Sequence, residues 1–141
     1  MRRSTKTRSR ALSLAFMVTL LLCACGGDHR HEDPAGSMTV PGLSTNAGKK
    51  WKMDDHTRSM FTVMTRRLAE HSGDPEELGK SLSDDLDRLV RGCTMTGSVH
   101  DELHRFLIFY VPAITTLSES GSAEALQKVT RLLKAYPEYF E

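Results

Sequence analysis

Residues 74–92 read DPEELGKSLSDDLDRLVRG, and they carry every signal of one amphipathic helix. Asp74 is a typical N-cap residue, Pro75 suits the first helical position, and acids follow at the positive end of the helix dipole. Leucines recur every three or four residues, which places them on one face. Gly92 is a common helix terminator. The stretch therefore predicts a helix that starts at Asp74, runs to about Arg91 and buries Leu78, Leu82, Leu86 and Leu89.

The same apolar period extends in both directions from this stretch. On the N-terminal side it predicts a helix from Trp51 to His71, which the pair Ser72-Gly73 ends. The apolar face of this helix is expected to contain Met53, Met60, Phe61, Met64 and Leu68.

Two further helices are expected on the C-terminal side. One opens at Ser98, with Asp101 three residues later as in a capping box, and ends before the turn 120–122. We expect Pro112 to kink it. The other runs from Ala123 to about Tyr136, where Pro137 stops it. The inner faces are expected to be His100, Leu103, His104, Leu107, Val111 and Ile114 in the first, and Leu126, Val129, Leu133 and Tyr136 in the second.

Four helices of similar length joined by short turns predict an all-α fold. The expected arrangement is an antiparallel up-down four-helix bundle over residues 50–141. About 90 residues can bury one modest hydrophobic core, so this region is expected to be one domain.

The N-terminus is typical of an export signal. Five basic residues among the first ten precede an apolar run over 11–22, which is too short to span a bilayer. The run ends in Leu22-Cys23-Ala24-Cys25-Gly26, which resembles the lipobox of bacterial lipoproteins. The resemblance implies a signal peptide over 1–24, acylation of Cys25 and a flexible lipidated tether over 25–49. An ordinary secretory signal cut after Ala24 is the alternative.

The lipobox resemblance also implies a location. The protein is expected to be anchored to a membrane in the cell envelope through its lipid, on the extracytoplasmic side. In a cell with two membranes, Gly26 resembles the residue that directs lipoproteins to the outer membrane, facing the periplasm.

Processing would change the net charge of the chain. Five of the 19 Lys and Arg residues precede the cut and none of the 18 acids does, so the mature chain would carry a charge of about −4. A surface with this charge argues against nucleic acid as a partner. Processing would also leave Cys93 as the one cysteine outside the signal and the anchor, so no disulfide framework is expected.

The up-down topology would bring most of the soft donor atoms to one end of the bundle. The start of the first helix, the turn over 92–97 and the start of the third helix would lie there, beside the aromatic end of the last helix. The candidate ligands at this end are Met53, His56, Met60, Cys93, Met95, His100 and His104.

The spacing of His100 and His104 places both on one helical face, where two imidazoles can meet one metal ion. Both lie in the first two turns of their helix, where the positive dipole end favours neutral imidazole. Together with thiolate and thioether ligands, they suit copper, above all Cu(I). Zinc normally takes a fourth strong ligand. The alternative is ordinary packing, because Met fills core gaps and Cys93 alone behaves as a small hydrophobe.

Residues 93–104 read CTMTGSVHDELH, which resembles a motif of small exported bacterial helical proteins of no firmly known activity. The motif joins a Cys-Thr-Met to a His-x3-His pair. The resemblance implies that the cysteine and the histidines belong to one unit, and it implies no specific reaction.

Two other functions stay open beside copper sequestration or relay. A b-type haem could use Met60 with His100 or His104, whereas covalent attachment would need a Cys-x-x-Cys-His motif that the chain lacks. A metal-free envelope adaptor would instead bind a protein partner on its outer helix faces. Catalysis has little support, because Glu70, Asp84, Asp85 and Asp87 are expected on polar faces.

Overall fold

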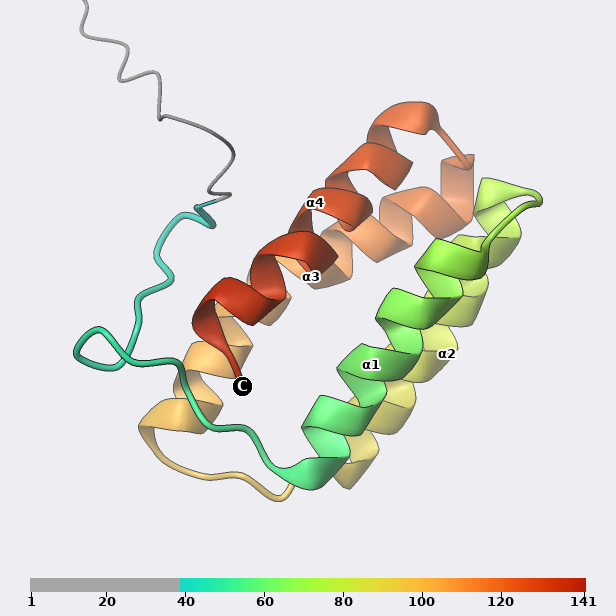
Figure 1. Cartoon of the computed structure of the whole chain (residues 1–141). Helices are drawn as coiled ribbons and strands as arrows, with labels where there is room; N and C mark the ends of the chain where they lie inside the picture. Colours follow the sequence, from blue (N-terminus) through green and yellow to red (C-terminus); the bar gives the residue numbers. More distant parts are fainter. Residues whose placement is uncertain (1–38) are drawn as a thin grey trace, which may run out of the picture. The chain divides into compact units, whose positions relative to one another are not determined.

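The computed structural model describes residues 39–141, and this part of the chain is all-α (Figure 1). Its helices are α1 (Asp55–Glu70), α2 (Pro75–Gly92), α3 (Ser98–Ser120) and α4 (Ala123–Tyr139). The predicted fold class is confirmed. The expected signal peptide, Cys25 and the tether up to residue 38 lie outside the described residues. Among the four helices, none combines the length and apolar character that a membrane span needs.

Helix α2 forms where the sequence predicts it. The Asp74 carboxylate accepts a hydrogen bond from the Glu76 backbone N–H at 3.0 Å, and Pro75 takes the first helical position. The four leucines of its stripe are buried, as expected. The local capping signals and the tertiary burial of this helix therefore agree.

Helix α1 starts four residues later than predicted. The side chain of Asp54 caps it by accepting a hydrogen bond from the Thr57 backbone N–H at 2.7 Å. Trp51 and Met53 lie before the helix in extended chain, because their backbone groups bond to the C-terminus instead. The expected helical start at Trp51 was therefore wrong.

The two ends of the domain are joined by backbone hydrogen bonds that we call the terminal clasp, residues 51–53 with 139–141. Trp51 N–H donates to the Tyr139 carbonyl at 2.7 Å, Met53 N–H donates to the Glu141 carbonyl at 2.8 Å, and Glu141 N–H donates to the Trp51 carbonyl at 2.9 Å. Trp51 and Phe140 thereby form an isolated parallel β-bridge. The clasp fixes the chain ahead of α1 against the end of α4.

The segment 39–49, expected to be part of the tether, also contacts the helices. Val40 is buried, and its N–H donates to the Tyr139 hydroxyl at 3.1 Å. Ser44 N–H donates to the Glu102 carboxylate at 2.6 Å. These contacts tie the last part of the expected tether to α3 and α4.

Helix α3 buries a different face from the predicted one. Leu103, Leu107 and Ile114 are inward as expected, but His100 is half-buried, His104 is exposed and Val111 is 41% exposed. The remaining buried positions are taken by Glu102, Phe106, Tyr110, Ala113 and Leu117. The larger apolar area of Phe106 and Tyr110 accounts for the choice, since burial free energy scales with that area.

Two predictions were wrong, the capping box at the start of α3 and the end of α4 at Pro137. The cap of α3 is Gly97, at φ 73°, and Ser98 is the first helical residue without a side-chain capping bond. Helix α4 continues through Pro137 to Tyr139. Proline there removes only one helical donor near the helix end, and burial of Tyr139 and Phe140 holds the last turn in place.

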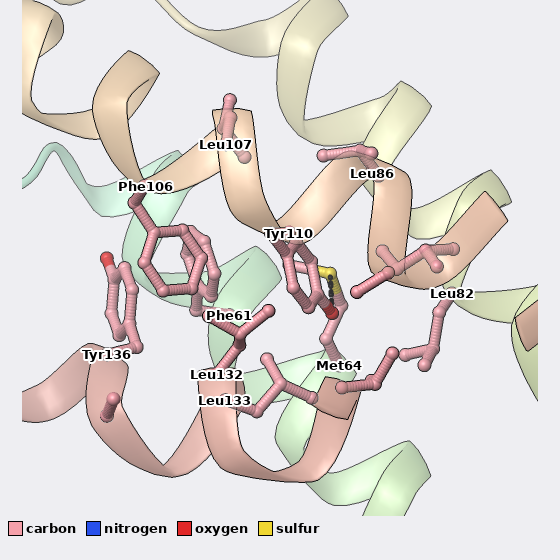
Figure 2. Close-up of a cluster of buried hydrophobic side chains, with 14 of the residues drawn as sticks. Phe61, Met64, Leu82, Leu86, Phe106, Leu107, Tyr110, Leu132, Leu133 and Tyr136 are labelled. Atoms are coloured by element: carbon pink, nitrogen blue, oxygen red, sulfur yellow. Dashed lines mark hydrogen bonds between the residues drawn. The ribbon is translucent and has the colours of Figure 1, made fainter. Parts of the chain in front are cut away.

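Consecutive helices run in opposite directions, and α2 packs on both α1 and α3 (Figure 1). Helix α4 packs on α3 and makes less extensive contact with α1. An aromatic cluster fills the core, with Phe61 stacked on Tyr136 at 3.7 Å between ring centroids and Phe106 edge-on to both (Figure 2). The Tyr110 hydroxyl donates to the Met64 sulfur at 3.4 Å, and burial raises the pKa of Tyr110.

Two acids lie in the interior, which the sequence pattern did not predict. Asp85 has no exposed surface and accepts from Arg67 Nε at 2.6 Å and from Arg67 Nη2 at 3.3 Å. The expectation of Asp85 on a polar face was wrong, because the α1 guanidinium reaches it across the α1–α2 contact. Glu102 is equally buried and pairs with Arg105.

Candidate functional site: the turn between α2 and α3

The five-residue turn over 93–97 brings the end of α2 to the start of α3. Cys93 is the C-cap of α2 and is half-buried. Gly97 turns the chain into α3 with a positive φ, a conformation that glycine adopts without strain. His100 and His104 follow in the first two turns of α3, so the predicted cysteine and both histidines come from one continuous stretch.

The structure places these three side chains in a row. Cys93 Sγ lies 3.6 Å from His100 Nδ1, and His100 Nε2 lies 2.8 Å from His104 Nε2. The two imidazole rings are 4.4 Å apart between centroids and tilted by 52°. The i, i+4 spacing therefore does bring the histidines together, although toward solvent rather than into the core.

The short contact between the two Nε2 atoms requires a proton between them. One nitrogen must donate as N–H and the other must accept through its lone pair. His100 would then use both of its ring nitrogens, one toward Cys93 and one toward His104. Because the two nitrogens of an imidazole point in diverging directions, Cys93 and His104 lie on opposite sides of the His100 ring.

Met95 lies in the same turn and interacts with the cap of α1. Its sulfur accepts a hydrogen bond from Asp54 N–H at 3.4 Å, and the Thr94 hydroxyl donates to the Asp54 carboxylate at 3.3 Å. Burial raises the pKa of Asp54, but the hydrogen bonds from Thr57 and Thr94 outweigh it and lower this pKa below the usual value. These contacts couple the 93–97 turn to the start of α1.

The other expected ligands have structural partners. Met53 is 2% exposed and belongs to the core, and Met60 packs against that core from the surface. The His56 Nε2 atom lies 3.1 Å from the Arg88 carbonyl, so this imidazole interacts with the end of α2. It also packs against the backbone of Gly92, where any larger residue would meet the ring.

Within residues 39–141, no group of three or more His, Cys, Asp or Glu side chains is arranged to hold one metal ion. Cys93, His100 and His104 do not form such a group, because the two ring nitrogens of His100 point in diverging directions, one toward Cys93 and one toward His104. The site therefore consists of the facing Nε2 atoms of His100 and His104, with the Cys93 thiol next to the other ring nitrogen of His100. This arrangement can share a proton, and it can accept an ion that tolerates two ligands.

Sequence reasoning missed the Arg67–Asp85 pair, although a signal for it was present. Asp85 lies seven residues after Leu78, three after Leu82 and four before Leu89, so it falls on the buried stripe of α2. A charged residue at such a position needs a partner, and a basic residue on a neighbouring helix was the place to look.

Comparison with known proteins adds no relative. The sequence matches no protein-family model, no curated protein is significantly similar to it, and no solved structure is significantly similar to its fold.

Proposed function

We infer that the protein is a lipid-anchored extracytoplasmic domain that binds a soft metal ion, Cu(I), through His100 and His104, for copper sequestration or relay. The observation that carries this proposal is the separation of 2.8 Å between the two Nε2 atoms on the surface of α3. The lipid anchor rests on the resemblance of residues 22–26 to a lipobox.

The facing nitrogens can accept one ion after a small movement. Metal–nitrogen bonds of about 2.0–2.1 Å put two nitrogens about 3.3 Å apart in a tetrahedral site and about 4 Å apart in a linear one. Moving from 2.8 Å to either value takes a rotation of the exposed His104 side chain. The ion would replace the shared proton. Cu(I) is favoured over Zn(II) because it accepts two soft or borderline ligands, whereas zinc takes four.

Cys93 is assigned a supporting role in this proposal. Its sulfur contacts Nδ1 of His100 and so orients the ring that presents Nε2 to the ion. A hydrogen-bond partner on the second nitrogen of a metal-binding histidine commonly fixes its orientation and tautomer. Met95 flanks the turn through its bond to Asp54, while Met53, Met60 and His56 are left out of the ligand set.

Haem and a metal-free adaptor are the other functions considered for the domain. A haem would need space beside Met60 between the helices. The core between α1, α3 and α4 is filled by Phe61, Phe106 and Tyr136, which pack against one another at centroid distances of 3.7–5.6 Å. No specific observation at the 93–104 stretch favours a protein partner over an ion.

Competitive titration with Cu(I) against a chelator tests the metal proposal. All variants carry Cys23→Ser and Cys25→Ser, so that Cys93 is the remaining thiol of the three. His100→Ala and His104→Ala should each weaken Cu(I) binding about 100-fold or more, because a chelating pair is lost. Cys93→Ser should weaken it about tenfold through loss of orientation. In the protein with both histidines intact, Cu(I) binding should weaken as the pH is lowered from about 8 to about 5, because protons compete with the ion for the imidazole nitrogens.

His71→Ala is the matched control, because His71 caps the far end of α1 and does not contact the pair. It should bind Cu(I) as the parent protein does. Equal affinity in all of these variants, or no binding by the parent, would favour the adaptor function instead.

The anchor is tested separately by mass spectrometry of the protein from its native membrane. The expected mature N-terminus is an acylated Cys25, and Cys25→Ser should accumulate as unacylated precursor. A mature, unmodified N-terminus between residues 11 and 27 would remove the lipoprotein proposal without affecting the metal site.

A further inference from the structure

A groove of about 990 Å³ lies between α1 and α4, on a different part of the domain from the His100–His104 pair. It exists because these two helices make less extensive contact with each other than the consecutive helices do. Figure 1 shows the two helices side by side. The floor of the groove is apolar and is formed by Phe61, Leu68, Leu126, Leu133 and Tyr136.

The rim of the groove is basic. Arg58 and Arg66 line it from α1 and Lys134 lines it from α4, whereas Glu141 is the one acid among the lining residues. Arg58 pairs with Asp55. Arg66 and Lys134 form no ion pair with any residue of the described part. An anion at the rim would therefore find two cationic side chains that are not ion-paired within residues 39–141.

Two buried polar atoms without partners belong to residues that line this groove. His71 Nε2 and the Tyr136 hydroxyl make no hydrogen bond within residues 39–141. Tyr136 is 9% exposed, and burial raises its pKa, so its hydroxyl is present as a neutral donor. Both atoms are buried, so they leave the accessible floor of the groove apolar.

The groove suits a slender ligand better than a protein. Its lining runs along α1 from Arg58 to His71, about 20 Å at 1.5 Å per residue. Fifteen residues line it, whereas a stable protein interface takes about 20–30 residues on each side. Its volume lies at the upper end of the range of about 300–1,000 Å³ for small-molecule sites. An apolar chain would cover the floor, and an anionic end group would meet the rim.

We propose that the α1–α4 groove binds a single long acyl chain that carries an anionic head group. The acyl chain lies on the floor between Leu68 and Tyr136, and Arg66 with Lys134 attracts the head group. The occupant is a free long-chain fatty acid, whose carboxylate matches the two cationic side chains Arg66 and Lys134. Its binding is independent of the copper proposal, because the groove contains neither His100 nor His104.

Displacement of a fluorescent fatty acid from the full chain, below the critical micelle concentration of each competitor, tests this proposal. The competitors are palmitate, laurate, lysophosphatidylglycerol, hexadecanol and hexadecyltrimethylammonium. Each buried methylene should raise affinity about fourfold, so palmitate should bind far more tightly than laurate. Palmitate should also bind more tightly than hexadecanol. Palmitate should bind at least as tightly as lysophosphatidylglycerol, and much tighter binding of lysophosphatidylglycerol would replace the fatty acid with a phospholipid.

Substitution of an exposed lining residue separates the groove from non-specific binding to the apolar N-terminal run. Thr65→Trp fills the groove without removing a core side chain and should weaken palmitate at least about tenfold. Thr115→Trp, an exposed threonine on α3, is the control and should bind palmitate as the parent does. The double variant Arg66→Glu and Lys134→Glu should lose the preference for palmitate over hexadecanol.

Equal palmitate binding by Thr65→Trp and Thr115→Trp would overturn the groove as the site. Binding of hexadecyltrimethylammonium as tight as that of palmitate would overturn the anionic head group. Absence of binding by every competitor, with a photo-cross-linker at residue 65 capturing a protein in the native membrane, would replace the acyl chain with a protein occupant. Titration of Cu(I) in the same variants should be unchanged, so failure of one proposal does not imply failure of the other.

Discussion

Substitution of Gly79 by alanine tests the closest contact between two helices of the domain. Gly79 is buried in α2, at its contact with α3. A Cβ atom added there would lie 2.4 Å from the Ser118 backbone nitrogen, 2.6 Å from its Cα and 2.7 Å from the Leu117 carbonyl carbon. The neighbours are backbone atoms of α3, so no side-chain rotation can relieve the contact.

Two opposing effects decide the magnitude. Alanine is favoured over glycine in a helix interior by about 1 kcal/mol, and it removes backbone freedom from the unfolded chain. Ordinary contact at 3.4 Å requires α3 to move by about 1 Å along the line to Ser118. Overpacking of a close-packed interior costs about 1–3 kcal/mol, and a rigid backbone neighbour places this case at the upper end. The net expectation for Gly79→Ala is a loss of about 2 kcal/mol in the free energy of unfolding.

Urea unfolding followed by far-ultraviolet circular dichroism measures this loss. Gly73→Ala, just ahead of the same helix, is the control, because its added Cβ would meet no atom closer than His71 Cε1 at 3.9 Å. Its effect should stay within about 0.5 kcal/mol. An unchanged or higher stability of Gly79→Ala would refute the close approach of α2 and α3.

Three further predictions concern charge and the chain ends. Asp85→Asn should lower the free energy of unfolding by about 2–3 kcal/mol. This is less than the loss of about 3–5 kcal/mol on breaking a fully buried ion pair, because Arg67 is 38% exposed. The exposed control Asp84→Asn should be nearly neutral in the same assay. Asp54→Ala should cost about 1 kcal/mol at neutral pH. Because the folded-state pKa of Asp54 is lowered, its contribution is present above about pH 4 and lost as the pH falls further, so wild type and variant should converge in acid unfolding curves. Phe140→Ala should cost about 3–5 kcal/mol, and a thermal midpoint equal to that of exposed Glu138→Ala would exclude burial of the Phe140 ring as a stabilising feature.

The helical class could be predicted because the decisive signals are local. Asp74, Pro75 and the leucine stripe determine α2 within one stretch, and burial then follows the same stripe. Pro137 shows where local rules end. Its missing donor predicts a helix end, but the burial of Tyr139 and Phe140 against distant parts of the chain outweighs one lost hydrogen bond.

The candidate site was predicted in part for the same reason. The i, i+4 spacing correctly brings His100 and His104 together, since helix geometry alone decides it. Whether these histidines face inward depends on which side chains of α3 are buried in the core, and the buried positions are occupied by Phe106 and Tyr110 among others. The groove between α1 and α4 could not be predicted, because it depends on the distance between these two helices in the folded domain, which no local sequence signal determines.

The terminal clasp also determines how the domain carries mechanical load. A pull on the chain ahead of Val40 first loads the contacts of Val40 with α4 and of Ser44 with α3, and at residues 51–53 three hydrogen bonds pass part of the force to the end of α4. The covalent chain passes the remainder to α1. Tension from the N-terminal side is thus divided among α1, α3 and α4, and α1 carries the whole load only once these contacts have opened.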